Sequence, residues 1–301
     1  MKSKEELRNI FEQNPLGAMD GHIHTHLCDG KPEMTVSGIA DRAKENGLKL
    51  IMLTPHFHKK VGDETAVLYE DSDEEILLRL REEIITYQKQ SDGKLQILLS
   101  VEADILSESG ETALQISKAG EDALDLVTPT VNYHPLLPLK AVEVTYGRCI
   151  EEMYTSGLYS RFAEAAGGVR RILESLYETE ANAIRKSRYP AILGHFFAAH
   201  SYAVWPYSWF GAKEEHLEVM KQGAGKVLDA CESKGAFVDL TGIHLRGMSC
   251  REKMIQDDFF FDFQSWFTDQ CRKRGICMVP GSDSHSLESV GNVTYYSVFD
   301  K

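Results

Sequence analysis

The sequence has no apolar run long enough to cross a membrane. None of its hydrophobic stretches approaches the roughly 20 residues that a membrane-spanning helix needs. Residues 1–10 are charged and helical in pattern, and they lack the apolar region of a signal peptide. We therefore expect a soluble, cytoplasmic protein without a membrane partner.

Cysteine and basic residues are also in short supply. The 6 cysteines are scattered without a CxxC pair, which argues against a disulfide framework or a zinc–thiolate site. The 46 Asp and Glu residues outnumber the 33 Lys and Arg residues, giving a formal charge of -13. This charge repels nucleic acid phosphates over most of the surface, so no nucleic acid partner is expected. Carboxylates that bind cations contribute to this total.

What is present is a regular alternation of buried strands and helices. The 301 residues, 43% of them hydrophobic, can form the core of one α/β barrel domain covering 1–301. Apolar runs predict parallel strands separated by helices of 3.6-residue period. The predicted strands are 18–22, 48–54, 95–103, 124–131, 191–194, 236–240 and 276–280, and the predicted helices are 33–46, 71–90, 111–119, 161–187, 213–234 and 257–274. Residues 135–160 are the least regular and are interpreted as an insertion or lid.

Metal-ligand residue types follow almost every predicted strand. They are His22 and His24, His56, Glu102, His134, His195, and Asp283 with His285. Alternate side chains of a strand share a face, so His22 and His24 can approach one ion, as can Asp283 and His285. The carboxyl ends of parallel barrel strands are where such folds place their sites. Imidazole combined with carboxylate suits zinc, iron or manganese.

Each signal has a simpler alternative when it stands alone. A single His-x-His is often a solvated pair, and a buried Glu102 is also explained by a structural ion pair. The convergence of six strand ends favours a shared metal site.

The ordered motifs resemble those of the PHP (polymerase and histidinol phosphatase) family. They are DGHIHTHLCDG, LTPHFH, VEAD, NYHP, LGH and PGSDSH, and they span about residues 18–291. The resemblance implies a distorted (βα)7 barrel, an α/β fold of PHP type, with three divalent ions (Zn, Fe or Mn) at its mouth. It implies one ion on His22, His24, Glu102 and Asp283, a second on Glu102, His134 and His195, and a third on Asp29, His56 and His285.

The implied activity is hydrolysis of a small phosphate ester by metal-bound hydroxide, with His22, His24, Glu102, Asp283 and His285 as catalytic residues. The substrate would be a phosphomonoester such as histidinol phosphate or a nucleotide. The chain departs from the family pattern at Pro55, where many members have Asp, and at 196–197, where a Gly-His-x-Asp motif becomes Gly-His-Phe-Phe. Proton transfer and substrate choice are therefore expected to differ from those of histidinol phosphatases.

Substrate-binding residues are marked less clearly. Lys59, Lys60 and Arg246 are the nearest basic candidates for a phosphate, and His58 and His200 are candidate acids near the mouth. For all five, an ordinary surface position is the simpler interpretation. The aromatic segment 196–210 either lines an apolar pocket or packs an insertion against the rim.

Three other functions remain open at this point. An amidohydrolase-like C–N hydrolase also uses His-x-His in a barrel, but the bridging lysine typical of that group is missing at Asn132, Tyr133 and His134. A 3′–5′ exonuclease fits the metal ligands but conflicts with the acidic balance. A noncatalytic metal-binding barrel is the third alternative.

Overall fold

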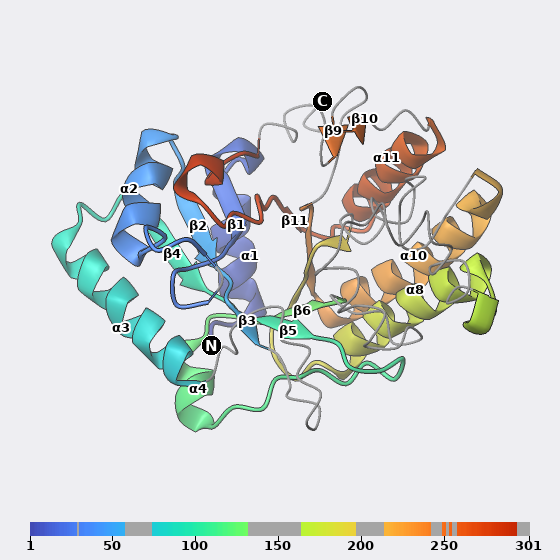
Figure 1. Ribbon diagram of the computed structural model, residues 1–301, viewed down its shortest axis with the longest axis horizontal. Coiled ribbons are helices and arrows are strands. Elements are labelled where there is room, and N and C mark those ends of the chain that lie inside the picture. The colour runs from blue at the N-terminus through green and yellow to red at the C-terminus, as the bar shows by residue number, and fades with distance from the viewer. Residues whose placement is uncertain are drawn as a thin grey trace.

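The computed structural model of the protein describes residues 1–28, 30–57, 74–131, 164–196, 214–241, 249–250, 253–254 and 258–293. Strands and helices alternate through these residues, and the strands lie between two groups of helices (Figure 1). Helices α2 and α3 lie on one side, and α8, α10 and α11 lie on the other. The α/β class predicted from the sequence is confirmed.

The strands of the described residues form three parallel sheets of three strands each and one short antiparallel pair. The first sheet has the order β1 (Met19–Ile23), β2 (Leu50–Leu53), β4 (Gln96–Leu99), and the second has the order β3 (His56–Phe57), β5 (Glu102–Asp104), β6 (Thr128–Thr130). The third has the order β11 (Met278–Val279), β8 (Phe237–Asp239), β7 (Ile192–Leu193). Strands β9 (Ser249–Cys250) and β10 (Lys253–Met254) form the antiparallel pair.

Backbone hydrogen bonds run from each parallel sheet to the next. The N–H of Glu102 donates to the carbonyl of Pro55 at 2.8 Å, so β3 and β5 continue the pairing of β2 and β4. The N–H of Ile192 donates to Val127 O at 2.9 Å, which connects the β6 segment to β7. The N–H of Gly21 donates to Pro280 O at 2.6 Å and connects β1 to the residues after β11.

Local sequence signals explain where α1 and α2 begin and where α10 ends. The helices in the described ranges are α1 (Lys4–Glu12), α2 (Val36–Glu45), α3 (Glu74–Gln90), α4 (Lys118–Ala123), α8 (Val169–Lys186), α10 (Leu217–Lys234) and α11 (Asp258–Lys273), with 3₁₀ turns η1 (Leu16–Ala18), η2 (Glu214–His216) and η3 (Leu287–Ser289). Ser3 and Glu6 form a capping box at α1, and the Thr35 hydroxyl caps α2. Gly235 ends α10 in the left-handed conformation.

One predicted helix is wrong, and several predicted strands are longer than the observed ones. Residues 111–117 are not helical, because Leu106 N donates to Glu111 O and Ala113 N to Asp104 O, folding this segment back along β5. The predicted strand 95–103 becomes two short strands, β4 and β5, separated by two residues, whereas the predicted strand 48–54 shortens to β2 and β3 begins beyond its predicted end. The predicted insertion or lid at 135–160 lies outside the described residues.

Two apolar clusters form the core. The larger cluster lies between the strands and the surrounding helices, and the smaller one lies between the strands themselves. The members of the smaller cluster are Leu7, Phe11, Met19, Leu50, Met52, Leu98, Leu126, Ile192, Phe237 and Val279. Its strand residues come from every parallel sheet or its flanking segment, and Leu7 and Phe11 of α1 complete it. Within the described ranges, none of the helices combines the length and apolarity that crossing a membrane requires.

Candidate metal centre

Small and polar residues follow the smaller apolar cluster along the strands. Alternate strand residues share a face, so the residues two positions beyond the apolar ones continue the same row. These residues are Thr54, Ser100, Thr128, Gly194, Asp239 and Gly281. Ser100 Oγ and Thr128 Oγ1 lie 2.7 Å apart in this buried layer. A further step of two residues leads from Thr54 to His56 and from Ser100 to Glu102, so the strands themselves direct these side chains to a common region.

The carboxylate of Glu102 lies among four imidazoles. Its Oε2 atom is 3.1 Å from His22 Nε2 and 3.5 Å from His24 Nε2. The same atom is 3.4 Å from His56 Nδ1, whereas Oε1 is 3.2 Å from His195 Nε2. Glu102 is fully buried. Its two oxygens therefore face different sets of histidines, as expected for a carboxylate that can bridge two cations.

The charges in this cluster depend on one another. Burial opposes ionisation of Glu102, but positive charge on the neighbouring imidazoles, His195 first and then His56, holds its pKa well below the usual range. Burial also disfavours the charged form of His22, yet hydrogen bonds to Asp239 and Glu102 raise its pKa to about 10. The carboxylates thus favour positive charge at the centre. A divalent cation carries a larger positive charge than a single ring proton does.

Asp283 and His285 form the more accessible side of the cluster. Asp283 Oδ1 lies 2.9 Å from His24 Nε2 and 3.7 Å from His22 Nε2, and its side chain is 36% exposed. Burial alone would raise the pKa of Asp283. The hydrogen bond with His24 and the charges of His195 and His22 lower the pKa by more than burial raises it, so the net shift is downward. His285 Nδ1 lies 2.9 Å from the carbonyl oxygen of Asp283 and donates to it. When the ring is neutral, this bond leaves Nε2 of His285 with its lone pair.

Two of these residues have a left-handed backbone conformation, which residues other than glycine rarely adopt. The φ angle is 38° at His195 and 55° at Asp283. Such conformations cost about 1–3 kcal/mol each and persist where surrounding contacts enforce them. The N–H of Asp283 donates to His22 O at 2.9 Å, and the N–H of His195 donates to Asp239 Oδ2 at 3.3 Å. These hydrogen bonds hold both side chains toward the cluster.

The structure brings together every described member of the predicted ligand set. Three groups have ligand atoms within 4.8 Å of one another: His24, His56 and His285; His22, His195 and Asp283; and His22, His24 and Glu102. Glu102 contacts His22 and His24 of the first predicted set, His195 of the second and His56 of the third, and His24 also adjoins the third set. Ring centroids of His24 lie 4.5 Å from His56 and 4.0 Å from His285.

These residues fit divalent cations on the chemistry of their donor atoms. Mixed imidazole and carboxylate donors suit zinc and its first-row neighbours. His195 Nε2 is buried and makes no hydrogen bond within the described ranges, although Glu102 Oε1 is 3.2 Å away. A buried imidazole nitrogen with this environment is suited to metal coordination, because burying it otherwise costs free energy.

Two motif glycines allow the strands to approach closely beneath the cluster. A Cβ atom at Gly281 would lie 2.3 Å from Thr241 Oγ1 and 2.7 Å from His22 Cβ. A Cβ atom at Gly194 would lie 2.3 Å from Thr130 Oγ1. Neither position can hold a larger residue unless its neighbours move. This explains the glycine one residue before His195 and the glycine two residues before Asp283.

The sequence prediction missed two buried aspartates. Asp239, inside predicted strand 236–240, has Oδ2 2.9 Å from His22 Nδ1. The sequence feature that could have identified Asp239 is an acidic residue in an apolar strand, on the same face as Phe237 two positions earlier. Asp20 accepts hydrogen bonds from the Ser282 N–H at 2.9 Å and the Gly291 N–H at 2.8 Å, joining the first motif to the last. Burial raises the pKa of Asp20 to about 6.

Several predicted residues lie outside the described part of the chain. They are the candidate ligands Asp29 and His134 and the candidate substrate residues His58, Lys59, Lys60, His200 and Arg246. From the aromatic segment 196–210, only Phe196 is described. It is fully buried and stacks on Phe267 of α11 with ring centroids 4.1 Å apart. Phe196 therefore belongs to the larger apolar cluster, and the rest of the aromatic segment lies outside the described residues.

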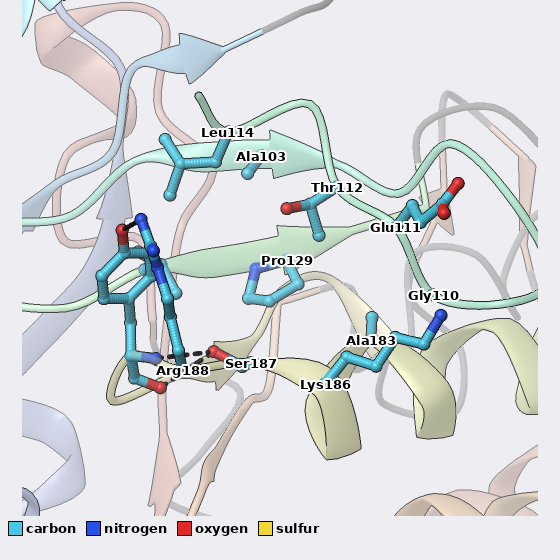
Figure 2. Close-up of a pocket in the computed structure, with 12 residues that line it drawn as sticks. Ala103, Gly110, Glu111, Thr112, Leu114, Pro129, Ala183, Lys186, Ser187 and Arg188 are labelled. Carbon is cyan, nitrogen blue, oxygen red and sulfur yellow. Dashed lines mark hydrogen bonds between the residues drawn. The ribbon is translucent and has the colours of Figure 1, made fainter. Parts of the chain in front are cut away.

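A cavity of about 230 Å³ lies apart from the histidines, beside the end of α8 (Figure 2). Ala103 and Pro129 line it from β5 and β6, and Arg188 and Ser187 line it from the residues after α8. Ala103 therefore lies on the opposite face of β5 from its neighbour Glu102. None of the lining residues belongs to the histidine–carboxylate cluster.

The fold and the cluster together define an α/β protein with a histidine- and carboxylate-rich centre of the kind that metal-dependent hydrolases use. No protein-family model matches the chain. Histidinol-phosphatase of Bacillus subtilis (strain 168) is 25% identical over 284 residues, covering 90% of this chain and 95% of the relative.

Two solved structures share the fold. One is histidinol phosphate phosphatase from Lactococcus lactis subsp. lactis Il1403, complexed with zinc, L-histidinol and phosphate, with a TM-score of 0.58, 15% identity and coverage of 94% of both chains. The other is a candidate histidinol phosphatase from Listeria monocytogenes, with a TM-score of 0.61, 17% identity and coverage of 93% of this chain and 99% of that one. The resemblance to PHP histidinol phosphatases is confirmed.

Proposed function

We propose that this protein is a metal-dependent phosphoesterase that hydrolyses a small phosphomonoester, with histidinol phosphate as the first substrate to test. The observation that carries this proposal is the Glu102 carboxylate, which presents one oxygen to His22, His24 and His56 and the other to His195. Chain-long similarity to the Bacillus subtilis histidinol-phosphatase supports the choice of substrate.

We propose further that residues 1–301 form one PHP-type domain whose seven strand units close into a barrel. The hydrogen bonds from Gly21 to Pro280 and from Ile192 to Val127 support closure, because they join the outer strands of adjacent sheets. The smaller apolar cluster also supports it, since a closed barrel is filled by side chains from all of its strands.

The same proposal assigns up to three ions to the cluster, of zinc, iron or manganese. His22, His24, Glu102 and Asp283 would hold the first, and Glu102 and His195 would contribute to the second together with His134. His56 and His285 would contribute to the third together with Asp29. Divalent ions bound there would lower the pKa of water toward about 7 and neutralise phosphoryl oxygens.

The protein's own groups define the direction from which the substrate approaches. Glu102, His22 and His24 are fully buried, whereas Asp283 is 36% exposed and His285 is partly exposed. A phosphate ester therefore reaches the centre from the side of Asp283 and His285. The Nδ1–H group of His285 donates to the Asp283 carbonyl, which fixes the ring with Nε2 as its acceptor atom.

The test is a substrate panel measured with and without a chelator. Purified protein is supplied with Mn²⁺ or Zn²⁺ and assayed with histidinol phosphate, a nucleotide and a sugar phosphate. We expect chelator-sensitive release of phosphate, with histidinol phosphate hydrolysed at the highest kcat/KM. Absence of chelator-sensitive turnover on every phosphate ester would instead favour a noncatalytic metal-binding protein.

Variants connect the activity to the cluster. His24→Ala and Asp283→Ala should each lower bound metal and reduce kcat/KM by at least about 100-fold, because each removes a donor atom at the centre. Glu288→Gln is the matched control, since Glu288 is an acidic residue near the last motif whose side chain is 83% exposed. Wild-type metal content in both cluster variants would refute the ligand assignment.

A further inference from the structure

Asp239 is a buried carboxylate whose described contacts all lie around the candidate metal centre. It sits at the end of β8 and is 1% exposed. Its Oδ2 atom lies 2.9 Å from His22 Nδ1 and accepts a hydrogen bond from the His195 N–H at 3.3 Å. Its Oδ1 atom accepts hydrogen bonds from the Thr241 N–H at 2.7 Å and the Thr241 hydroxyl at 2.6 Å. Among the described residues, its ion pairing is confined to His22.

The contact with His22 determines which ring nitrogen of that histidine carries a proton. A carboxylate only accepts hydrogen bonds, so the proton between these groups resides on His22 Nδ1. The opposite ring nitrogen, Nε2, faces Glu102 Oε2 at 3.1 Å and Asp283 Oδ1 at 3.7 Å. A metal ion bound at Nε2 would displace the proton that the imidazolium of the metal-free protein carries there, and the Asp239 carboxylate holds the remaining proton on Nδ1.

The contact with His195 acts on the second side of Glu102. The His195 backbone has a φ of 38°, which the surroundings must stabilise. The N–H donated to Asp239 supplies part of that stabilisation and directs His195 Nε2 to within 3.2 Å of Glu102 Oε1. The His22 and His195 rings also stack, with centroids 4.5 Å apart. One carboxylate therefore contacts a histidine on each side of the candidate bridging residue.

The side chain of Asp239 is held in this orientation. Thr241 donates to it from both its backbone and its hydroxyl, and Gly281 approaches so closely that a Cβ atom there would lie 3.0 Å from Asp239 Oδ1. A side chain fixed in this way can hold its partners within the narrow limits that metal binding requires.

We propose that Asp239 is a positioning residue that selects the metal-binding tautomer of His22 and orients His195, thereby coupling the ligands on both sides of Glu102. This role rests on the proposed metal centre. It does not depend on which phosphate ester is hydrolysed.

The experiment compares Asp239→Asn, Asp239→Ala and Thr241→Val with the Glu288→Gln control. Metal-free protein is titrated with Zn²⁺ in competition with a chromophoric chelator, and the unfolding free energy of each metal-free variant is measured in urea. We expect zinc affinity to fall by about 10- to 100-fold in both Asp239 variants, the range typical of residues that orient a metal ligand. Thr241→Val should cause a smaller loss, because it removes one of the two Thr241 donors and leaves the carboxylate in place.

A spectroscopic measurement separates positioning from general stability. In metal-free wild-type protein with ¹⁵N-labelled histidine, the neutral form of His22 should carry its ring proton on Nδ1. Asp239→Asn should weaken that preference, because an amide that retains both Thr241 bonds turns its NH₂ group toward His22. Wild-type zinc affinity in Asp239→Asn and Thr241→Val, or an unchanged His22 tautomer in Asp239→Asn, would overturn the proposal. If zinc affinity falls as expected but no phosphate ester is hydrolysed, the proposed function fails while the role of Asp239 stands.

Discussion

Replacing Gly281 with alanine should damage the candidate metal centre while the protein still folds. The added Cβ would lie 2.3 Å from Thr241 Oγ1, 2.7 Å from His22 Cβ and 3.0 Å from Asp239 Oδ1. Separations below 3.0 Å cannot persist, so the neighbours must shift by several tenths of an ångström. His22 is fully buried and Thr241 is 5% exposed, so neither has open space into which it can move.

The expected magnitude follows from this crowding. Inserting one extra carbon into a tightly packed site costs about 1–3 kcal/mol, which lowers Tm by several degrees in a domain of this size. The displaced atoms belong to His22 and to the Asp239 carboxylate beside it. Zinc affinity should therefore fall by about 10- to 100-fold, or about 1.4–2.8 kcal/mol, which is comparable to the loss of stability.

The assay measures zinc binding and thermal unfolding on the same preparations. Gly225→Ala is the control, because Gly225 lies in α10 and a Cβ there would meet no atom within 4 Å. We expect wild-type zinc affinity in the control and weakened affinity in Gly281→Ala. Equal affinities in wild type and Gly281→Ala would show that the close approach of these strands does not determine the position of His22.

Three further predictions concern stability. Gly223→Ala should destabilise the protein by about 1–3 kcal/mol in urea unfolding, because the added Cβ would lie 2.1 Å from Tyr177 Cδ2. Gly225→Ala in the same helix should be neutral or stabilising by up to about 1 kcal/mol. Equal effects of the two substitutions would contradict the packing of α8 against α10. Burial raises the pKa of Glu180 well above 4.5, so the unfolded state releases this proton at lower pH than the folded state, and wild-type stability relative to Glu180→Gln should decline as the pH rises above 4.5. A constant difference would exclude this effect. Adding saturating Zn²⁺ to metal-free protein should raise Tm and a chelator should reverse the rise, because an ion that binds only the folded state stabilises it; an unchanged Tm would argue against a site formed in the folded protein.

The sequence by itself determined which strands lead to candidate ligands. The two-residue alternation along a strand is a local property, so His56 and Glu102 could be assigned to a common face from their spacing beyond apolar residues. The ordered motifs carried the resemblance to the PHP family, and the similarity of the whole chain to a histidinol-phosphatase agrees with it. Strand ends were predicted less well, because the pairing that divides β2 from β3 depends on neighbouring strands.

Only the tertiary structure showed how the candidate ligands are held. The contact between His22 and Asp239 joins residues 217 positions apart, and no local pattern indicates which partner a buried aspartate will meet. The left-handed backbone at His195 and Asp283, like the crowding at Gly281, likewise results from contacts between strands that are distant in sequence. Sequence periodicity fixes the face on which a side chain lies, whereas its partners depend on which strands become neighbours when the chain folds.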